Sequence, residues 1–354
     1  MVQFYGSPIV SPYLTTKSIT PENQETPIQF IYGNTVGEAL FYRRNHFAYP
    51  FSHSFFLPVE GSVISPKAFS IQDICSLPSR EIKVLLECSG NKRELFEPKV
   101  YGEQWGKGAM SQGIWKGVPL KTLLQYTGVV PTAREIVFEG YDFGTRPGDE
   151  HSIHYSRSLP LEKAFDPDII IAYAYNHQPI PFKHGFPLRL IVPSWYAMAS
   201  VKWLKKIIVI DEPFRGHYQS EDYMYYPYKQ NDREKIPVTT MNVNSTIQYP
   251  LDMQILSTGT HEISGIAWTG NGKITEVQIS LDGGHTWGLC KRTSTPGHYT
   301  WISWTYTWKV DQPGEYSIRT KATDSSGNMQ PEKPFWNRKG YGYNAVDVIK
   351  VKVE

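Results

Sequence analysis

Cysteine is scarce in this chain: its 354 residues include only Cys75, Cys88 and Cys290. Three thiols can form at most one disulfide, so a disulfide framework is excluded as the basis of the fold. Long hydrophobic runs are also absent. The longest apolar stretches, such as residues 169–172 and 207–210, fall far short of the roughly 20 residues with which a helix crosses a bilayer. We therefore expect no membrane span.

An excess of one charge is missing as well. The chain has 36 basic and 34 acidic side chains, and a net charge of +2 is too small for a protein that mainly neutralises a phosphate backbone. Nucleic acid is therefore not an expected partner. Signature motifs for ATP, dinucleotides, serine hydrolases and zinc are absent. Residues 1–20 show no export signal, so we expect a cytoplasmic protein or, if a signal has been removed, a periplasmic one.

Hydrophobic residues make up 40% of the chain, and its length predicts two or three domains of about 100–200 residues each. Residues 1–30 are polar and are expected to form an N-terminal arm over the surface. Residues 31–237 mix short β-rich runs (83–88, 135–140, 169–175, 188–192 and 203–211) with a few helices, which is an α+β pattern. The clearest helix is expected to open at Pro119 and to stop at Gly128, with its leucines on one face.

Residues 238–354 show a different pattern, in which apolar residues alternate with polar ones along short strands. The alternation is seen at Val277 and Ile279, at Trp304 and Trp308, and around Val351. Turn sequences such as Asn-Gly at 271–272 and Asp-Gly-Gly at 282–284 separate the strands. About 115 residues of this kind predict an immunoglobulin-like β-sandwich.

Cys88 stands where an apolar strand meets a Gly/Asn turn, and Lys92 and Arg93 follow it. Nearby positive charge lowers the pKa of a thiol, and the thiolate is the form that attacks substrates or binds soft metals. The alternative is an inert buried cysteine, because free cysteine is among the most buried residue types.

Further basic residues lie inside or next to apolar runs, where an unpaired charge is costly. They include Arg43, Arg44, His184, Arg189 and Lys202. An anionic ligand would account for them, since guanidinium groups bind oxyanions through two parallel hydrogen bonds. A solvated basic face is the alternative for any one of these residues. Tyr223 belongs to a tyrosine cluster, in which its phenol could donate a hydrogen bond or simply pack.

Together these pieces resemble the sulfite oxidase family of molybdopterin enzymes, and in particular its haem-free bacterial or plant-like members. The family's motifs occur in its order from about Gly33 to Glu354, as YRRNH at 42–46, ECSGNKR at 87–93, WGKGA at 105–109, WKGVPL at 115–120, HGFPLR at 184–189, ASVKW at 199–203, LDGGHTW at 281–287 and FWNRKG at 335–340. The resemblance implies a sulfite-oxidase-type molybdopterin-binding domain followed by a β-sandwich dimerisation domain.

The resemblance also implies roles for individual residues. Cys88 would be the protein ligand of a molybdenum ion that is otherwise held by molybdopterin, with no haem in this chain. The expected pterin contacts are Tyr42, Arg43, Arg44, Asn45, His46, Asp142, His184, Arg189, Ser200, Val201 and Lys202. Asp142 is the weakest of these, because the spacing around it departs from the better-known members. The expected anion pocket consists of Arg44, Arg93, Trp105, Tyr223 and Lys339, where Lys339 replaces an arginine of the vertebrate enzymes.

The implied reaction is the two-electron oxidation of sulfite, or a similar small oxyanion, to sulfate. The electrons would pass to an external acceptor, either cytochrome c or dioxygen, and the enzyme would be a homodimer. A nitrate-reductase-like oxygen-atom transfer is the nearest alternative, favoured less because of the Asp-Tyr setting of Tyr223. A related sulfoxide reductase would lack the sandwich. A non-catalytic family member is the third alternative, against which an intact Cys88 speaks.

Overall fold

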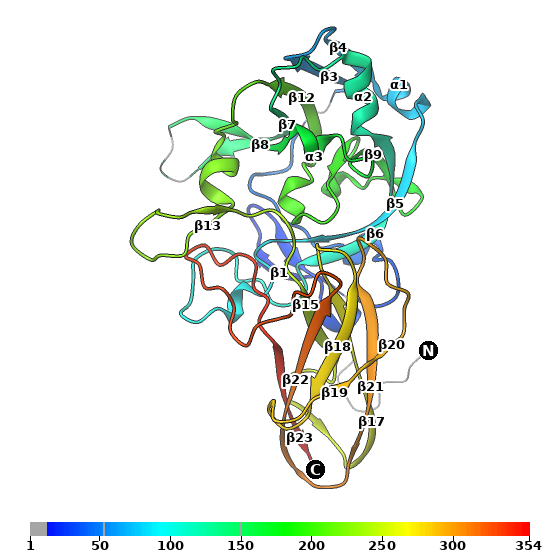
Figure 1. Ribbon diagram of the computed structural model, residues 1–354, viewed down its shortest axis with the longest axis vertical. Helices are drawn as coiled ribbons and strands as arrows, with labels where there is room; N and C mark the ends of the chain where they lie inside the picture. The colour runs from blue at the N-terminus through cyan, green and yellow to red at the C-terminus, as the bar shows by residue number, and fades with distance from the viewer. Residues whose placement is uncertain (1–12, 52–53, 147, 149) are drawn as a thin grey trace.

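The structure is a computed structural model that describes residues 13–51, 54–146, 148 and 150–354. Figure 1 shows a broad upper part, which is coloured blue to green, above a slender lower part built from the yellow to red strands. The upper part contains two five-stranded sheets, and the lower part contains a four-stranded and a five-stranded sheet. This is the α+β and β-sandwich architecture that the sequence predicts. The domain boundaries themselves remain a prediction.

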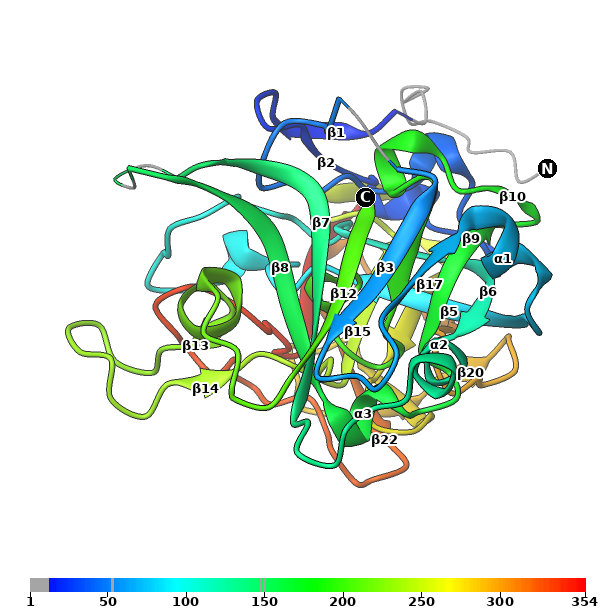
Figure 2. The same cartoon turned by 90° about the horizontal axis from the view of Figure 1, so that it is seen from above.

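One upper sheet has the order β10-β9-β6-β5, with β11 also paired to β9. Its strands are β5 (Arg80–Glu87), β6 (Met110–Pro119), β9 (Ile170–Tyr175), β10 (Gln178–Pro179) and β11 (Arg189–Ile191). The other sheet has the order β4-β3-β12-β7-β8. Its strands are β3 (Phe56–Gly61), β4 (Lys67–Ser70), β7 (Glu135–Thr145), β8 (Ser152–Pro160) and β12 (Leu204–Ile210). Figure 2 shows β3, β12, β7 and β8 side by side. All five predicted β-rich runs are confirmed as strands.

The helices of the described part are short: α1 (Ile71–Ser76), α2 (Leu120–Thr127) and α3 (Leu161–Ala164), with several 3₁₀ turns and a π-helical turn at Tyr218–Asp222. The predicted helix is α2, in which Leu120, Leu123 and Leu124 are buried in the main core. Pro119 precedes the first helical turn, and Gly128 ends it with a positive φ of 65° that favours glycine. Within the described residues, none of the helices combines the length and the apolar character that a membrane span requires.

The lower part consists of two sheets packed face to face. One is β15 (Asn244–Tyr249), β17 (Gly259–Trp268), β21 (Ile302–Val310) and β20 (Lys291–Arg292), and the other is β16 (Gln254–Leu256), β23 (Asp347–Val353), β22 (Gly314–Asp324), β18 (Ile274–Ser280) and β19 (Gly288–Leu289). Strand β23 alternates buried and exposed residues along its whole length, as its sequence predicts. Trp304, Trp308 and Ile318 belong to the core between the sheets.

Residues 13–30 are more deeply integrated than the arm that the sequence predicts. They include the hairpin β1 (Thr15–Ser18) and β2 (Asn23–Glu25), and Asn23 and Thr26 are fully buried. The Oδ1 atom of Asn23 accepts a hydrogen bond from the backbone N–H of Asn45 at 2.7 Å, and a carboxylate oxygen of Glu25 accepts one from the N–H of Gly106 at 2.8 Å. Polar side chains can therefore be buried here, because they satisfy backbone groups of the upper part. The remaining part of the predicted arm, residues 1–12, lies outside the described residues.

The two parts are joined through buried polar contacts directly behind Cys88. The ammonium group of Lys92 donates to Oδ1 of Asn244 at 2.8 Å and to the carbonyl of Ser245 at 2.8 Å, and it lies 3.5 Å from Asp347. Asp347 also accepts from Lys107 at 2.9 Å. The loop that follows Cys88 is thus anchored to the sandwich. The short pair β13 (Met224–Tyr225) and β14 (Ile236–Pro237) leads from the upper part toward it.

Candidate active site

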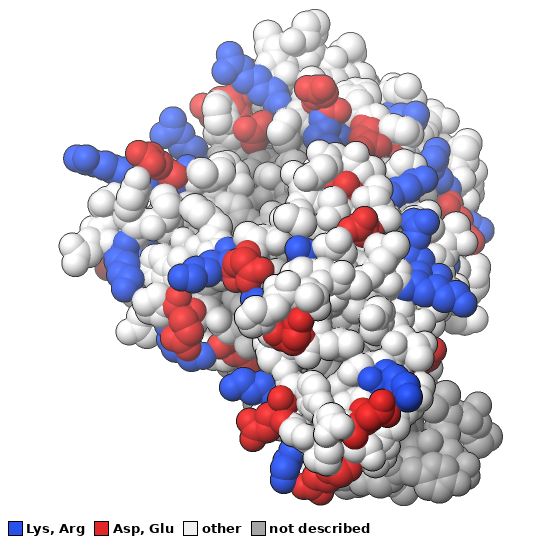
Figure 3. Space-filling view, turned by 60° about the horizontal axis from the view of Figure 1, so that its bottom comes forward, with Lys and Arg blue, Asp and Glu red and all other residues white. Residues whose placement is uncertain are grey.

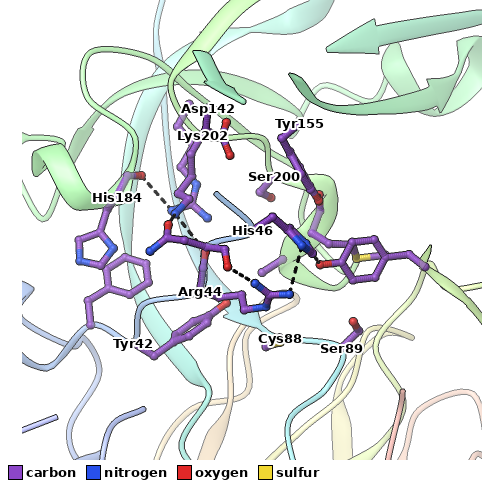
Figure 4. Close-up of a pocket in the computed structure, with 16 residues that line it drawn as sticks. Tyr42, Arg44, His46, Cys88, Ser89, Asp142, Tyr155, His184, Ser200 and Lys202 are labelled. Carbon is purple, nitrogen blue, oxygen red and sulfur yellow. Dashed lines mark hydrogen bonds between the residues drawn. The ribbon is translucent and has the colours of Figure 1, made fainter. Parts of the chain in front are cut away.

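Most of the sequence-predicted site residues meet at one cavity in the upper part (Figure 4). Its lining consists of Phe41, Tyr42, Arg44, Asn45, His46, Cys88, Ser89, Asp142, Tyr155, His184, Arg189, Ala197, Met198, Ser200, Lys202 and Tyr223. Most of these residues come from loops and strand ends, where protein folds commonly place ligand contacts, while Asp142 and Tyr155 lie within β7 and β8. The cavity is therefore the candidate functional site.

Cys88 follows the last residue of β5, and its backbone N–H donates to the carbonyl of Ala109 at 2.9 Å. Burial raises the pKa of the Cys88 thiol above its ordinary value, although the positive charges of Arg44 and Arg93 oppose this. The sequence-based expectation that neighbouring cations lower this pKa is therefore wrong in its net direction. The cause is that burial outweighs them and that Lys92 points into the sandwich. A bound metal cation is what deprotonates such a buried thiol.

Arg44, His46 and Tyr223 form a hydrogen-bonded row in the cavity lining, of which Figure 4 labels Arg44 and His46. Nη2 of Arg44 lies 3.3 Å from Nδ1 of His46, and Nε2 of His46 lies 2.7 Å from the Tyr223 hydroxyl. Burial raises the pKa of Tyr223 well above its usual value, so the phenol is protonated. All three residues line the same cavity as Cys88.

Lys202 and Asp142 also line the cavity. The Lys202 ammonium donates to the carbonyl of Arg44 at 3.1 Å and to the side chain of Asn45. Burial raises the pKa of the Asp142 carboxyl, and the charge of Lys202 opposes that shift. A Cβ atom at Gly140 would lie 2.9 Å from the backbone carbonyl oxygen of Lys202, so the close approach of these two segments favours glycine. The weakest sequence prediction, Asp142, thus lies in the cavity wall.

His184 and Arg189 close the cavity on the side of β11. The His184 ring stacks on Phe41 with the ring centroids 4.0 Å apart, and its carbonyl accepts from Nη1 of Arg189 at 3.0 Å. Gly185, with a φ of 113°, makes the turn between them. Ser200 accepts from the N–H of Val192 at 3.0 Å, which ties this wall to the core.

Several polar atoms of the cavity wall are buried and have no hydrogen-bond partner among the described residues. They are Oγ of Ser89, Oδ1 of Asp142, Nε2 of His184 and Nε of Arg189. An unsatisfied buried polar group costs about 1–3 kcal/mol, so four of them at one cavity indicate that a polar ligand completes the site. Donors and acceptors are both present, as a pterin with a phosphate group requires.

Five predicted site residues lie outside the cavity lining: Arg43, Arg93, Trp105, Val201 and Lys339. Arg43 turns toward the N-terminal segment and pairs with Glu22 at 2.9 Å, and Val201 is buried in the main core. Nε of Arg93 donates to the carbonyl of Lys339 at 3.1 Å, while Trp105 packs in the same apolar cluster as Cys88. The Lys339 side chain pairs with Asp222 at 2.8 Å. The roles predicted for these residues remain predictions.

The sequence reasoning missed five lining residues: Phe41, Ser89, Tyr155, Ala197 and Met198. Phe41 and Ser89 directly adjoin predicted site residues, so extending those motifs by one position would have found them. Tyr155 and Met198 carry no local signal. They meet only in the fold, where the Tyr155 hydroxyl donates to the carbonyl of Met198 at 2.7 Å.

Comparison with known proteins identifies the family of this chain. A family model described as oxidoreductase molybdopterin binding domain matches residues 46–218, and one described as Mo-co oxidoreductase dimerisation domain matches residues 235–354. The chain belongs to the sulfite oxidase family of molybdopterin enzymes. The first match covers most of the residues that line the cavity, and the second covers the strands of the sandwich.

Individual relatives of this family include both sulfite oxidases and nitrate reductases. The mitochondrial sulfite oxidase of Drosophila melanogaster is 34% identical over 96% of this chain and 63% of its own length. Nitrate reductase [NADH] 1 of Phaseolus vulgaris is 31% identical over 94% of this chain. The chain spans only 42% of that protein's length. The sulfane dehydrogenase SoxCD of Paracoccus pantotrophus has a structure with a TM-score of 0.83 and 25% identity, covering 99% of this chain and 94% of that one.

The residues of the cavity fit the Mo-molybdopterin of this family. Within the described part of the chain, no cluster of three or more His, Cys, Asp or Glu side chains could hold a metal ion by itself. Cys88 is the one thiol in the cavity lining, so the remaining ligands would have to come from the pterin. The unsatisfied atoms of Asp142, His184 and Arg189 are suited to its polar groups.

Proposed function

We propose that the chain catalyses the molybdenum-dependent oxidation of sulfite to sulfate and passes two electrons to an external acceptor. In this reaction one sulfite and one water give sulfate, two protons and two electrons. The observation that carries the proposal is the convergence of Arg44, Tyr223 and Cys88 on one cavity. The similarity to sulfite oxidases along nearly the whole chain supports it.

In this proposal each cavity residue has a defined task. Cys88 holds the metal through its thiolate, and the walls formed by Asp142, His184, Arg189 and Lys202 hold the pterin and its phosphate. When bound, this cofactor supplies the oxygen-atom transfer and the electron storage that side chains cannot provide. Arg44 positions the anionic substrate by charge and hydrogen bonding, and Tyr223 donates a hydrogen bond to it.

The electron acceptor, cytochrome c or dioxygen, lies outside this polypeptide in our proposal. The dimerisation domain at residues 235–354 supports a homodimer with one cavity in each subunit.

The face shown in Figure 3 carries basic and acidic side chains interspersed, in keeping with the net charge of +2. Such a surface offers no continuous basic stripe on this face for nucleic acid.

The test combines elemental analysis of the purified protein with sulfite-dependent reduction of ferricyanide, cytochrome c and dioxygen. We expect about one molybdenum per chain and turnover with sulfite, and the oxidant that is reduced fastest identifies the acceptor class. Nitrate reduction with a reduced dye is the control for the nitrate reductase alternative. Bound molybdenum with nitrate turnover and no sulfite turnover would overturn the proposed substrate, and a protein that takes up no molybdenum in a pterin-producing host would overturn the enzyme.

A further inference from the structure

The turn that carries Cys88 is closed by hydrogen bonds of its own. The backbone N–H of Gly90 donates to Sγ of Cys88 at 3.4 Å, and the N–H of Asn91 donates to the Cys88 carbonyl at 2.9 Å. The Asn91 side chain accepts from the N–H of Ala109 at 3.1 Å and donates to Oε1 of Glu87 at 3.1 Å. The residues before and after the cysteine are therefore linked across the turn.

The second carboxyl oxygen of Glu87 is bound from the other part of the molecule. Oε2 of Glu87 accepts a hydrogen bond from the indole N–H of Trp268 at 2.8 Å. Trp268 is the last residue of β17 in the sandwich, and both side chains are buried. Removing the indole N–H would therefore leave a buried acceptor unsatisfied, which is costly.

A second contact with the turn comes from the loop that precedes β23. The N–H of Gly342 donates to the carbonyl of Ser89 at 2.7 Å, and the Asn242 side chain donates to the Gly342 carbonyl at 2.8 Å. Trp268 and Gly342 thus contact the residues directly before and after Cys88. The second part of the chain supports the turn on both sides of the cysteine.

Hydrogen bonds to a metal-bound sulfur tune the metal. An N–H that points at a thiolate withdraws negative charge from the sulfur, so it raises the reduction potential of the bound metal. In the Cys88 turn this donor is the N–H of Gly90. The residues that hold this N–H in place can therefore act on a metal without touching it.

We propose that Trp268 is a positioning residue for the metal ligand, because through Glu87 it holds the Cys88 turn in the conformation that directs the Gly90 N–H at the sulfur. The sandwich then has a task besides the dimerisation that its family model describes. The part of this inference that concerns the metal rests on the proposed function, whereas the support of the turn by Trp268 does not.

Trp304 provides a matched control for Trp268. It is also a fully buried tryptophan of the sandwich, but its indole nitrogen has no hydrogen-bond partner among the residues that the structure describes. Phenylalanine at either position removes the same atoms and, at position 268, keeps an aromatic ring beside Lys92, whose ammonium lies 5.5 Å from the Trp268 ring centroid. A difference between the two variants therefore reports the hydrogen bond to Glu87 rather than the loss of buried volume.

The first test is hydrogen–deuterium exchange of the segment 88–93, measured by mass spectrometry on the intact chain. Loss of a hydrogen bond to a charged group raises the population of locally open states about tenfold or more, so we expect exchange to accelerate by that factor in Trp268→Phe. Trp304→Phe should exchange like the wild type.

A second variant keeps this test decisive if Trp268→Phe does not fold. Glu87→Gln weakens the same link from the upper part, because its amide offers one acceptor oxygen in place of two. It should accelerate exchange of the segment 88–93 in the same direction. Wild-type exchange rates in the folded variants of Trp268 and Glu87 would overturn the inference.

The second test is the reduction potential of the molybdenum-loaded enzyme, measured by a redox titration followed by EPR. We expect a lower potential in Trp268→Phe than in the wild type and in Trp304→Phe. We also expect kcat to fall by about 10–100-fold with little change in KM, which is the usual effect of losing a residue that orients a metal ligand.

The two tests separate this inference from the proposed function. A wild-type potential in Trp268→Phe, despite faster exchange of the segment 88–93, would contradict the effect on the metal. A wild-type chain that binds molybdenum but does not turn over sulfite would contradict the proposed function, and both the exchange result and the shift in potential would still stand.

Discussion

Asp222 holds the ammonium group of Lys339 at 2.8 Å. The same carboxylate oxygen also lies 3.2 Å from Nε2 of His217 and 3.8 Å from Arg146. Lys339 was expected to face the substrate anion, yet its charge is neutralised by the residue that directly precedes Tyr223. Of the three cations predicted for the anion pocket, only Arg44 lines the cavity.

Releasing this lysine should strengthen anion binding. In Asp222→Asn the cluster around residue 222 gains one positive charge, so we expect the KM for sulfite to fall roughly threefold to tenfold at low salt and the effect to fade as salt is added. Steady-state kinetics at several ionic strengths measure this. Asp232→Asn is the control, because Asp232 pairs with Arg338 at the exposed surface. A KM that stays the same or rises would show that Lys339 does not act on the substrate.

Arg189 provides a test of the pterin site that separates cofactor binding from folding. Its guanidinium is buried, and burial lowers its pKa to about 10, which shows how poorly the protein alone accommodates its charge. Arg189→Met should therefore leave the thermal stability of the cofactor-free protein unchanged or higher, while the retained molybdopterin falls by about tenfold or more. Melting curves and pterin content report the two effects. Arg134→Met, at an exposed position, is the control, and a variant that keeps its pterin would refute the assignment.

The anchor between the two parts predicts a pH dependence of stability. Burial alone would raise the pKa of Asp347, but Lys107 and Lys92 outweigh it and hold that pKa below 3.8. A carboxyl with a lowered folded-state pKa stabilises the fold above its ordinary pKa and loses that contribution as pH falls through the lowered one.

Accordingly, Asp347→Asn should lower the free energy of unfolding at neutral pH by about 3 kcal/mol, since it leaves two cations without their partner. The gap to the wild type should close as the pH falls below 3.8, the ordinary pKa of this group. Urea unfolding curves across this range measure the gap. Asp311→Asn, which removes only the exposed pair with Lys309, should change little at any pH. A gap of constant size would contradict the ion-pair account.

Local patterns predicted the elements that depend on local chemistry. The alternation in β23 and the leucine face of α2 are confirmed, because each is set by which side of an element meets the core. The motifs around Cys88 and His184 also predicted residues of the cavity. Each motif lies where a strand meets a loop, and such a junction can be recognised within a single short segment of sequence.

Other features depend on contacts between distant segments and left no such signal. The Lys339–Asp222 pair requires the π-helical turn at Tyr218–Asp222 to meet the loop near Gly340. Arg43 neighbours Arg44 in the chain but turns the other way, toward Glu22, because adjacent residues in an extended segment face opposite sides. Burial of the Cys88 thiol likewise depends on the folded surroundings and reverses the expected direction of its pKa shift.

The most direct test of the account is the sulfur coordination of molybdenum in Cys88→Ser, measured by X-ray absorption together with sulfite turnover. Cys290→Ser is the matched control, because Cys290 is buried in the sandwich core, away from the cavity. If Cys88 is the protein ligand, the metal loses one sulfur neighbour and turnover falls to background in Cys88→Ser, while Cys290→Ser keeps both. Full turnover and an unchanged sulfur count in Cys88→Ser would contradict the assignment of the active site.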